Sequence, residues 1–210
     1  MRRFCLALLL IGAGAAALAA PHGLYVPLDI WRDAEDAARH EAWYGGHLRA
    51  MAEPILSRRE DHSDFRRRFR MLVLPSFHPP YAIRVDQGTS GRARVRIVRL
   101  TGRGGYAPGE ILEQESYTLT ADQAARLDRD IEASGLASAP PRARAACIDG
   151  VQFVFELVDA QANRFVDRHQ CSLNRALETL VWRIDGLRRT VGSDLAQYRG
   201  GPAGTLRQGD

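Results

Sequence analysis

Apolar and polar positions alternate along two separate stretches of the chain, and each stretch predicts a β-hairpin. In residues 81–86 the apolar side chains occupy every second position, and residues 93–97 repeat this alternation after a Gly-Thr-Ser-Gly turn at 88–91. Residues 151–158 and 162–170 form the second predicted hairpin. A period of two is typical of strands with one buried face.

Two further apolar stretches accompany the hairpins. Residues 111–119 predict a strand that follows the first hairpin, and residues 71–74 form a short apolar run that ends at Pro75. Strands that follow one another through tight turns pair in the antiparallel sense. The pattern therefore predicts about five antiparallel strands, made of two hairpins and one single strand.

The N-terminal part of the chain has a helical pattern over residues 28–58. Asp29 is the expected N-cap, because a short acidic side chain accepts hydrogen bonds from the first turn. Gly45 and Gly46 are expected to break or kink this region into two helices. Residues 58–70 are dense in charge and are interpreted as a solvated linker or helix face.

Two more helices follow from local signals. Thr120 and Gln123 form a capping box that begins one helix, and Gly135 is placed to end it. The last helix is expected to begin near Ser172 and to carry an apolar stripe as far as Gly192.

These elements predict an α+β fold in which two helices pack on one face of the sheet. An N-terminal helical segment, residues 20–70, would cover an edge or the other face. The α+β domain itself is expected over residues 71–192, and residues 193–210, rich in glycine and polar side chains, are expected to be a disordered tail.

The first nineteen residues, 1–19, predict a signal peptide. Arg2 and Arg3 form a short positive region, residues 4–16 are apolar, and Ala17 and Ala19 are small residues of the kind that signal peptidase accepts. The alternative is an uncleaved membrane anchor, although the apolar stretch is short and rich in alanine and glycine. Cleavage after Ala19 predicts a periplasmic or secreted protein.

Charge adds little to this picture. All of the Lys+Arg count of 29 is arginine, which excludes Schiff-base lysine chemistry and a P-loop lysine. Removal of Arg2 and Arg3 takes the basic count from 29 to 27, against 25 acidic residues. A net charge of about +2 is too small an excess to predict nucleic-acid binding.

Two cysteines remain after the leader, Cys147 and Cys171, and they bracket the second hairpin. An even number of cysteines in an exported chain predicts a disulfide between them. The alternative is a reactive thiol, because His169 lies two residues from Cys171 and would share its face in a strand.

Four arginines form the candidate binding surface. Arg84, Arg92, Arg94 and Arg96 would project from one face of the first hairpin, where guanidinium groups suit carboxylates and phosphates. The structural alternative is that Glu113 and Glu115 of the next strand, or acids of the N-terminal helices, pair with this row.

Catalytic and metal-binding signals are weak. His40 and His47 are seven residues apart and lack a third spaced ligand, so no metal site and no cofactor are expected. His78 lies in a proline-restricted loop close to Ser76, without a nucleophile motif.

The sequence therefore predicts an exported, periplasmic, non-catalytic binding module of the bacterial envelope. Its expected partner is an anionic envelope component or an acidic protein. It is not expected to bind nucleic acid, and it would contact the membrane only through an uncleaved leader. Two alternatives stay open: an envelope hydrolase or thiol-dependent enzyme that uses His78 or the Cys171–His169 pair, and a protein inhibitor that presents the loop 102–109.

Overall fold

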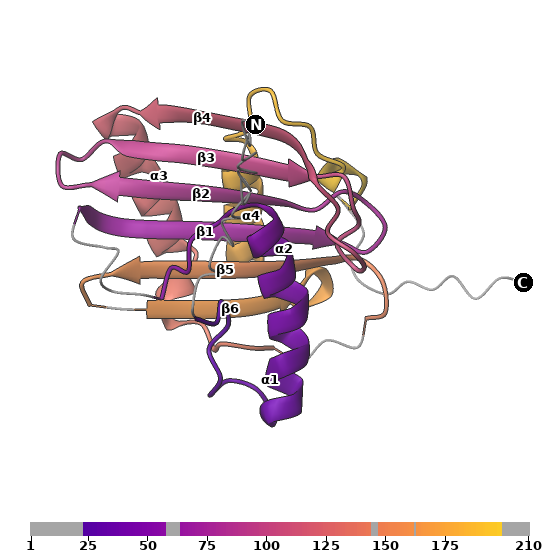
Figure 1. Ribbon diagram of the computed structural model, residues 1–210. Helices are drawn as coiled ribbons and strands as arrows, with labels where there is room; N and C mark the ends of the chain where they lie inside the picture. The colour runs from indigo at the N-terminus through magenta and orange to yellow at the C-terminus, as the bar shows by residue number, and fades with distance from the viewer. Residues whose placement is uncertain (1–22, 58–63, 144–146, 162, 199–210) are drawn as a thin grey trace, which may run out of the picture.

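A six-stranded antiparallel sheet forms the centre of the protein, as the computed structural model of the chain shows for residues 23–57, 64–143, 147–161 and 163–198 (Figure 1). The strands lie in the order β4-β3-β2-β1-β5-β6. Their bounds are β1 Phe65–Pro75, β2 Tyr81–Gly88, β3 Ala93–Leu100, β4 Ile111–Leu119, β5 Val151–Asp159 and β6 Asn163–His169. The predicted α+β class, the two hairpins and the strand 111–119 are confirmed, with one strand more than expected.

The additional strand is β1, which lies at the centre of the sheet between β2 and β5. The prediction of a solvated segment is wrong for residues 65–70, and the boundary expected after residue 70 falls inside this strand. The charged pattern was misleading because the arginines are paired inside the protein. Arg68 Nε donates to Asp86 Oδ1 at 2.8 Å, and Arg70 Nε donates to Glu156 Oε2 at 2.6 Å.

One face of the sheet is covered by α3 (Ala121–Ala133) and α4 (Arg175–Asp185), with the short 3₁₀ helix η3 (Leu136–Ser138) between β4 and β5 in the chain (Figure 1). The predicted capping box is present, since Thr120 and Gln123 satisfy each other's backbone N–H groups. Gly135 follows α3 with a φ of 70°, the left-handed conformation that suits glycine at this position.

The last helix ends earlier than its apolar stripe predicts. α4 begins after the N-cap Asn174 and ends at Asp185, not at Gly192. Beyond it, Glu115 of β4 accepts the backbone N–H groups of Arg189 at 2.8 Å and Thr190 at 3.1 Å. These bonds turn the chain away from a helix, because a helical Arg189 or Thr190 would donate to its own fourth preceding carbonyl.

The segment after α4 also corrects the expected tail. Val191 and Leu195 are buried against the helical face of the sheet, and η5 (Leu195–Tyr198) is a 3₁₀ helix. The prediction of disorder is therefore wrong for residues 193–198. Residues 199–210 lie outside the described residues.

The N-terminal segment covers the other face of the sheet, one of the two placements that the sequence left open (Figure 1). α1 (Ala34–His40), a π-helical turn η1 (Glu41–Gly45) and α2 (Gly46–Ala50) follow one another directly. The N-cap is Asp33, not Asp29. The expected division into two helices lies at the two glycines, since Gly45 ends the π-helical turn and Gly46 begins α2, and the backbone stays helical through both.

A second hydrophobic core lies beneath this segment. Tyr44, Leu48 and Met51 pack there with Leu72 of β1 and Val154 of β5. The central strands of the sheet are thus buried on both faces, while the edge strand β4 stays largely exposed. Within the part of the chain that the structure describes, no helix is both long and apolar enough to cross a bilayer. The predicted leader, residues 1–19, lies outside the described residues.

Candidate functional site

The disulfide, His78, His169 and loop 102–109 lie at one end of the sheet, where β1, β3 and β6 end and β2, β4 and β5 begin. The loops there are bonded to one another through their backbones. Gly104 N donates to His78 O at 3.1 Å, and Ser76 N donates to Gly150 O at 2.8 Å. Loop 102–109, the predicted inhibitor loop, is therefore fastened to its neighbours, while Tyr106 at its tip is 62% exposed.

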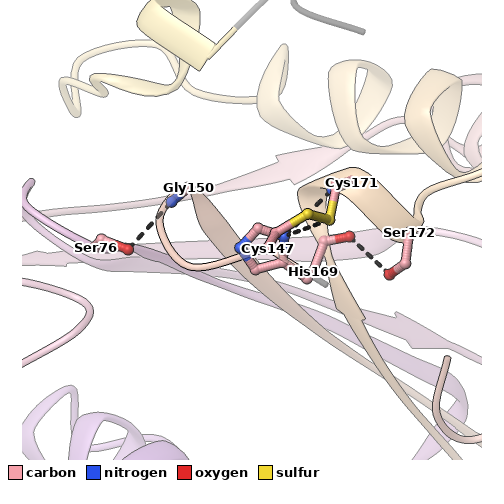
Figure 2. Close-up of a disulfide and its surroundings, with 6 residues drawn as sticks. All are labelled: Ser76, Cys147, Gly150, His169, Cys171 and Ser172. Carbon is pink, nitrogen blue, oxygen red and sulfur yellow. Dashed lines mark hydrogen bonds between the residues drawn. A yellow bond between two sulfur atoms is a disulfide. The ribbon is translucent and has the colours of Figure 1, made fainter. Parts of the chain in front are cut away.

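The disulfide predicted between Cys147 and Cys171 is present at this end of the sheet (Figure 2). Cys147 precedes β5, and Cys171 lies in the 3₁₀ helix η4 (Gln170–Ser172) that follows β6. Gln152 and His169 are the last paired residues of the hairpin, so both cysteines lie just beyond it. Their Cα atoms are 6.7 Å apart, and 24 residues separate them in sequence.

His169 is in direct contact with the disulfide (Figure 2). Its Nδ1 lies 3.1 Å from Cys171 Sγ and accepts the backbone N–H of Cys171 at 3.3 Å. Gly150 leaves room for the ring, because a Cβ there would lie 2.9 Å from His169 Cε1. Burial lowers the pKa of His169, and the Asp149 carboxylate opposes that effect.

The disulfide and His169 bring three side chains close together, although the two sulfurs are bonded to each other and are not free as ligands. Ligand atoms of Cys147, His169 and Cys171 all lie within 4.8 Å of one another. Zinc binds cysteine as the thiolate, so this group would hold a metal only after the disulfide is reduced.

A cavity of about 1070 Å³ opens beside the disulfide. It lies between the N-terminal segment, the chain around Arg142 and the ends of β5 and β6. Its lining combines aromatic and charged side chains with one half of the disulfide, and includes Trp31, Asp36, His40, Trp43, Tyr44, Arg142, Cys147, Gln152, Asp167 and His169.

Trp31 is the centre of the aromatic part of this cavity. The His40 ring stacks on it with the centroids 3.8 Å apart, and the Arg142 guanidinium lies 4.5 Å from the Trp31 ring centroid. His40 Nδ1 donates to Asp36 O at 2.8 Å, which fixes the orientation of the imidazole. The indole Nε1 of Trp31 is buried and has no hydrogen-bond partner among the described residues.

Asp167 is the buried carboxylate of the cavity. Tyr44 Oη donates to it at 3.2 Å, the Gln152 amide also donates to it, and Arg142 Nε lies 3.6 Å away. Burial raises the pKa of Asp167, because these donors replace only part of its hydration. Arg142 also lies 3.3 Å from Asp36, so one guanidinium joins both acids of the cavity.

The four arginines of the predicted row fall into two pairs, one that is bound to Glu53 and one that is exposed. Arg84 Nη1 lies 3.4 Å from Glu53 Oε2, and Arg96 also pairs with Glu53, which follows α2. Arg92 and Arg94 are exposed and make no ion pair within the described residues. The structural alternative therefore applies to Arg84 and Arg96, and anion binding at Arg92 and Arg94 stays a prediction.

The other acids considered for this row lie elsewhere. Glu113 and Glu115 are on the opposite face of the sheet, where they accept backbone N–H groups of Gly192 and of Arg189 and Thr190. Successive side chains of β4 point to opposite faces, and Ser116, not Glu113 or Glu115, is the residue paired with Arg96, so the two glutamates cannot reach the face that carries Arg84 and Arg96.

His78 is part of the same end of the sheet but is not paired with Ser76 in the described structure. Its Nδ1 lies 2.7 Å from Tyr198 Oη, and Ser76 Oγ instead accepts the N–H of Gly150 at 3.3 Å. A serine nucleophile needs a hydrogen-bonded base, so this arrangement does not favour hydrolysis at Ser76.

Sequence reasoning missed the cavity because its parts are far apart in the chain. Arg142 and Asp36 are separated by 106 residues, and Tyr44 and Asp167 by 123.

Comparison with protein-family models finds no match, and comparison with curated proteins finds none either.

Proposed function

We propose that this protein is an exported, periplasmic, non-catalytic binding module of the bacterial envelope, and that the cavity beside Trp31 holds its ligand. Two features support export: the leader pattern of residues 1–19 and the disulfide Cys147–Cys171. Disulfides persist in oxidising compartments such as the periplasm.

The observation that carries the binding proposal is the cavity itself. Its volume of about 1070 Å³ is in the range of small-molecule sites, and it combines aromatic walls with a few polar groups that fix orientation. Trp31 and Tyr44 are buried and Trp43 is half-buried, so the Trp43 ring is the aromatic surface that a compact body with apolar patches, such as a sugar ring, would contact.

Charge favours an anionic group on the ligand. Arg142 is 38% exposed, and Arg32 contributes a second guanidinium to the lining. Both acids of the cavity lie near Arg142; Asp36 is also engaged by Arg39 at 3.1 Å, and burial raises the pKa of Asp167. A carboxylate or phosphate of an envelope glycan or lipid would therefore be attracted to Arg142.

Tryptophan fluorescence tests the site directly, because two of the three tryptophans line the cavity. A Trp182→Phe background leaves Trp31 and Trp43 as reporters. The probes are lipopolysaccharide, vesicles of anionic phospholipid, and soluble peptidoglycan fragments. We expect one of them to change the emission saturably, and Arg142→Gln to weaken that binding about tenfold, which is the effect of losing one charge-assisted hydrogen bond.

Arg126→Gln is the matched control, since Arg126 is exposed on α3, on the opposite face of the sheet. It should bind as the unsubstituted chain does. The binding proposal fails if no probe gives a saturable change, or if Arg142→Gln binds as tightly as Arg126→Gln.

Export has its own test. Expression in a Gram-negative host, followed by fractionation and intact-mass measurement, should yield periplasmic protein whose mass begins at Ala20. Protein that stays in the cytoplasm with residues 1–19 attached would contradict export and leave the cavity to be judged separately.

A further inference from the structure

The non-catalytic role proposed above concerns ligand binding in the cavity beside Trp31. From the geometry around His169 we propose a separate redox activity: Cys147–Cys171 is a redox-active disulfide that exchanges with dithiols, with His169 as the acid–base partner of Cys171. A structural crosslink needs only two cysteines at a suitable distance. Here a histidine lies against one sulfur, and the other sulfur borders an open cavity.

The orientation of His169 is the first step of the argument. Its Nδ1 accepts the Cys171 N–H, so the proton of the neutral ring resides on Nε2 and the Nδ1 lone pair faces Cys171. The same Nδ1 is 3.1 Å from Cys171 Sγ. When the disulfide opens, this atom is already placed to take the thiol proton and to hold the thiolate as an ion pair.

Cys147 and Cys171 are both half-buried, but only Cys147 lines the cavity, and this favours attack at Cys147. Cys147 lines the cavity and precedes Ile148, which is 97% exposed. Cys171 lies in η4, where Ser172 Oγ donates to His169 O at 2.8 Å and holds the turn together. An incoming thiolate therefore reaches Cys147, and Cys171 is the leaving group.

The charged and polar groups around His169 favour this role. The Asp149 carboxylate opposes the lowering of the His169 pKa by burial. The Gln170 side chain lies near Gly150, and Gln152 is the residue paired with His169 across the hairpin. Burial lowers the pKa of His169 and keeps the imidazole neutral, and the Asp149 carboxylate offsets part of the cost of forming the imidazolium.

The exchange is balanced with a dithiol as the only co-reactant. The first substrate thiol loses a proton, and its thiolate forms a bond with Cys147 Sγ while the Cys147–Cys171 bond breaks. The electron pair goes to Cys171, and the proton is taken up at His169. The second substrate thiolate then attacks the mixed disulfide, Cys147 leaves and is protonated, and the substrate leaves as its disulfide, two electrons poorer.

The first experiment measures reduction of the natively folded full chain by dithiothreitol, with alkylation and mass analysis at timed intervals. We expect reduction without loss of the circular dichroism of the fold. His169→Gln should slow it about tenfold, because the leaving thiolate loses its proton partner. His78→Gln, a histidine of the same loop cluster bonded to Tyr198, should behave as the unsubstituted chain. Reduction that needs denaturant, or equal rates for His169→Gln and His78→Gln, would overturn the proposal.

A second measurement does not depend on the disulfide. In the full chain with Cys5→Ser and Cys147→Ser, Cys171 is the remaining thiol, and absorbance at 240 nm follows its ionisation. The midpoint should lie at least one pH unit below the value of about 8.5 for a free cysteine. Addition of His169→Gln should return it to about that value. A midpoint that His169→Gln does not move would show that His169 has no acid–base role. Neither readout involves the cavity ligand, so failure here leaves the binding proposal intact.

Discussion

Arg70 of the central strand and Glu53 of the N-terminal segment form an ion pair inside the protein, with Nη1 and Oε2 3.3 Å apart and side chains that are 0% and 1% exposed. Glu53 also forms ion pairs with Arg84 and Arg96, and Arg70 also donates a hydrogen bond to Glu156. The covering segment and the sheet are therefore joined by charge as well as by the second hydrophobic core. Each ion has been desolvated, so each depends on its partners.

Glu53→Ala should destabilise the protein by about 3–5 kcal/mol, because it leaves buried guanidinium groups without their shared carboxylate. Urea unfolding followed by circular dichroism measures this. The control is Glu35→Ala, which removes an exposed partner of Arg39 on α1, where the pair should be worth at most about 1 kcal/mol. Equal effects of the two substitutions on the free energy of unfolding would contradict the conclusion that the ion pairs of Glu53 join the N-terminal segment to the sheet.

Asp167 predicts a pH dependence of a particular sign. Burial raises the pKa of this carboxyl in the folded state, so the folded chain binds a proton that the unfolded chain has already lost. The stability from this group is fully present below the ordinary pKa of an aspartate and is lost as the pH rises through the raised value. Asp167→Asn, which keeps an acceptor for Tyr44 and Gln152, removes this dependence.

Melting temperatures at pH 4, 5, 6 and 7 give the comparison. Relative to the unsubstituted chain, Asp167→Asn should gain stability as the pH increases. If the difference between the two chains narrows or stays constant over that range, Asp167 is not a carboxyl whose charged form is penalised by burial.

The disulfide should contribute to stability without being essential for folding. Cys147 and Cys171 are 24 residues apart, and closing a loop of this size restricts the unfolded chain by about 3 kcal/mol. Replacing both by serine should lower the free energy of unfolding by that amount, while the far-ultraviolet spectrum stays unchanged. Loss of the folded spectrum in the double variant would mean that the hairpin end cannot form without the crosslink.

Two glycines predict opposite effects of alanine. A Cβ at Gly104 would lie 2.6 Å from Pro75 N, so Gly104→Ala should push loop 102–109 off the end of β1 and destabilise the chain by about 2 kcal/mol or more. Gly46 is helical, with a φ of −58°, and a Cβ there would have no atom within 4 Å outside the nearby helix backbone. Gly46→Ala should therefore stabilise by about 0.5–1 kcal/mol, measured in the same unfolding assay.

Local patterns were sufficient for much of the fold. The capping box at Thr120, the glycine after α3 and the alternation in β2, β3, β4 and β5 depend on neighbours in the chain, and all were predicted. The cysteine pair was also predicted, because the hairpin that carries it is local. In each case the stabilising contacts are close in sequence.

The prediction was wrong where residues far apart in the sequence form an ion pair or a hydrogen bond that the local pattern does not show. The charge pattern of β1 predicts that its arginines are solvated. Arg70 is instead fully buried, because Glu53 and Glu156 neutralise its charge. The apolar stripe predicts a helix as far as Gly192. The carboxylate of Glu115 in β4 instead accepts hydrogen bonds from backbone N–H groups that would donate within such a helix.

The sequence by itself determined the α+β class, the hairpins and the disulfide, since period, turn residues and caps act within a few residues. Only the tertiary structure decided that charged β1 is the central strand, that Glu53 divides the arginine row, and that Trp31, Arg142 and Asp167 line one cavity beside His169. Those outcomes rest on desolvated charges and on contacts across more than a hundred residues, and neither is encoded in local pattern.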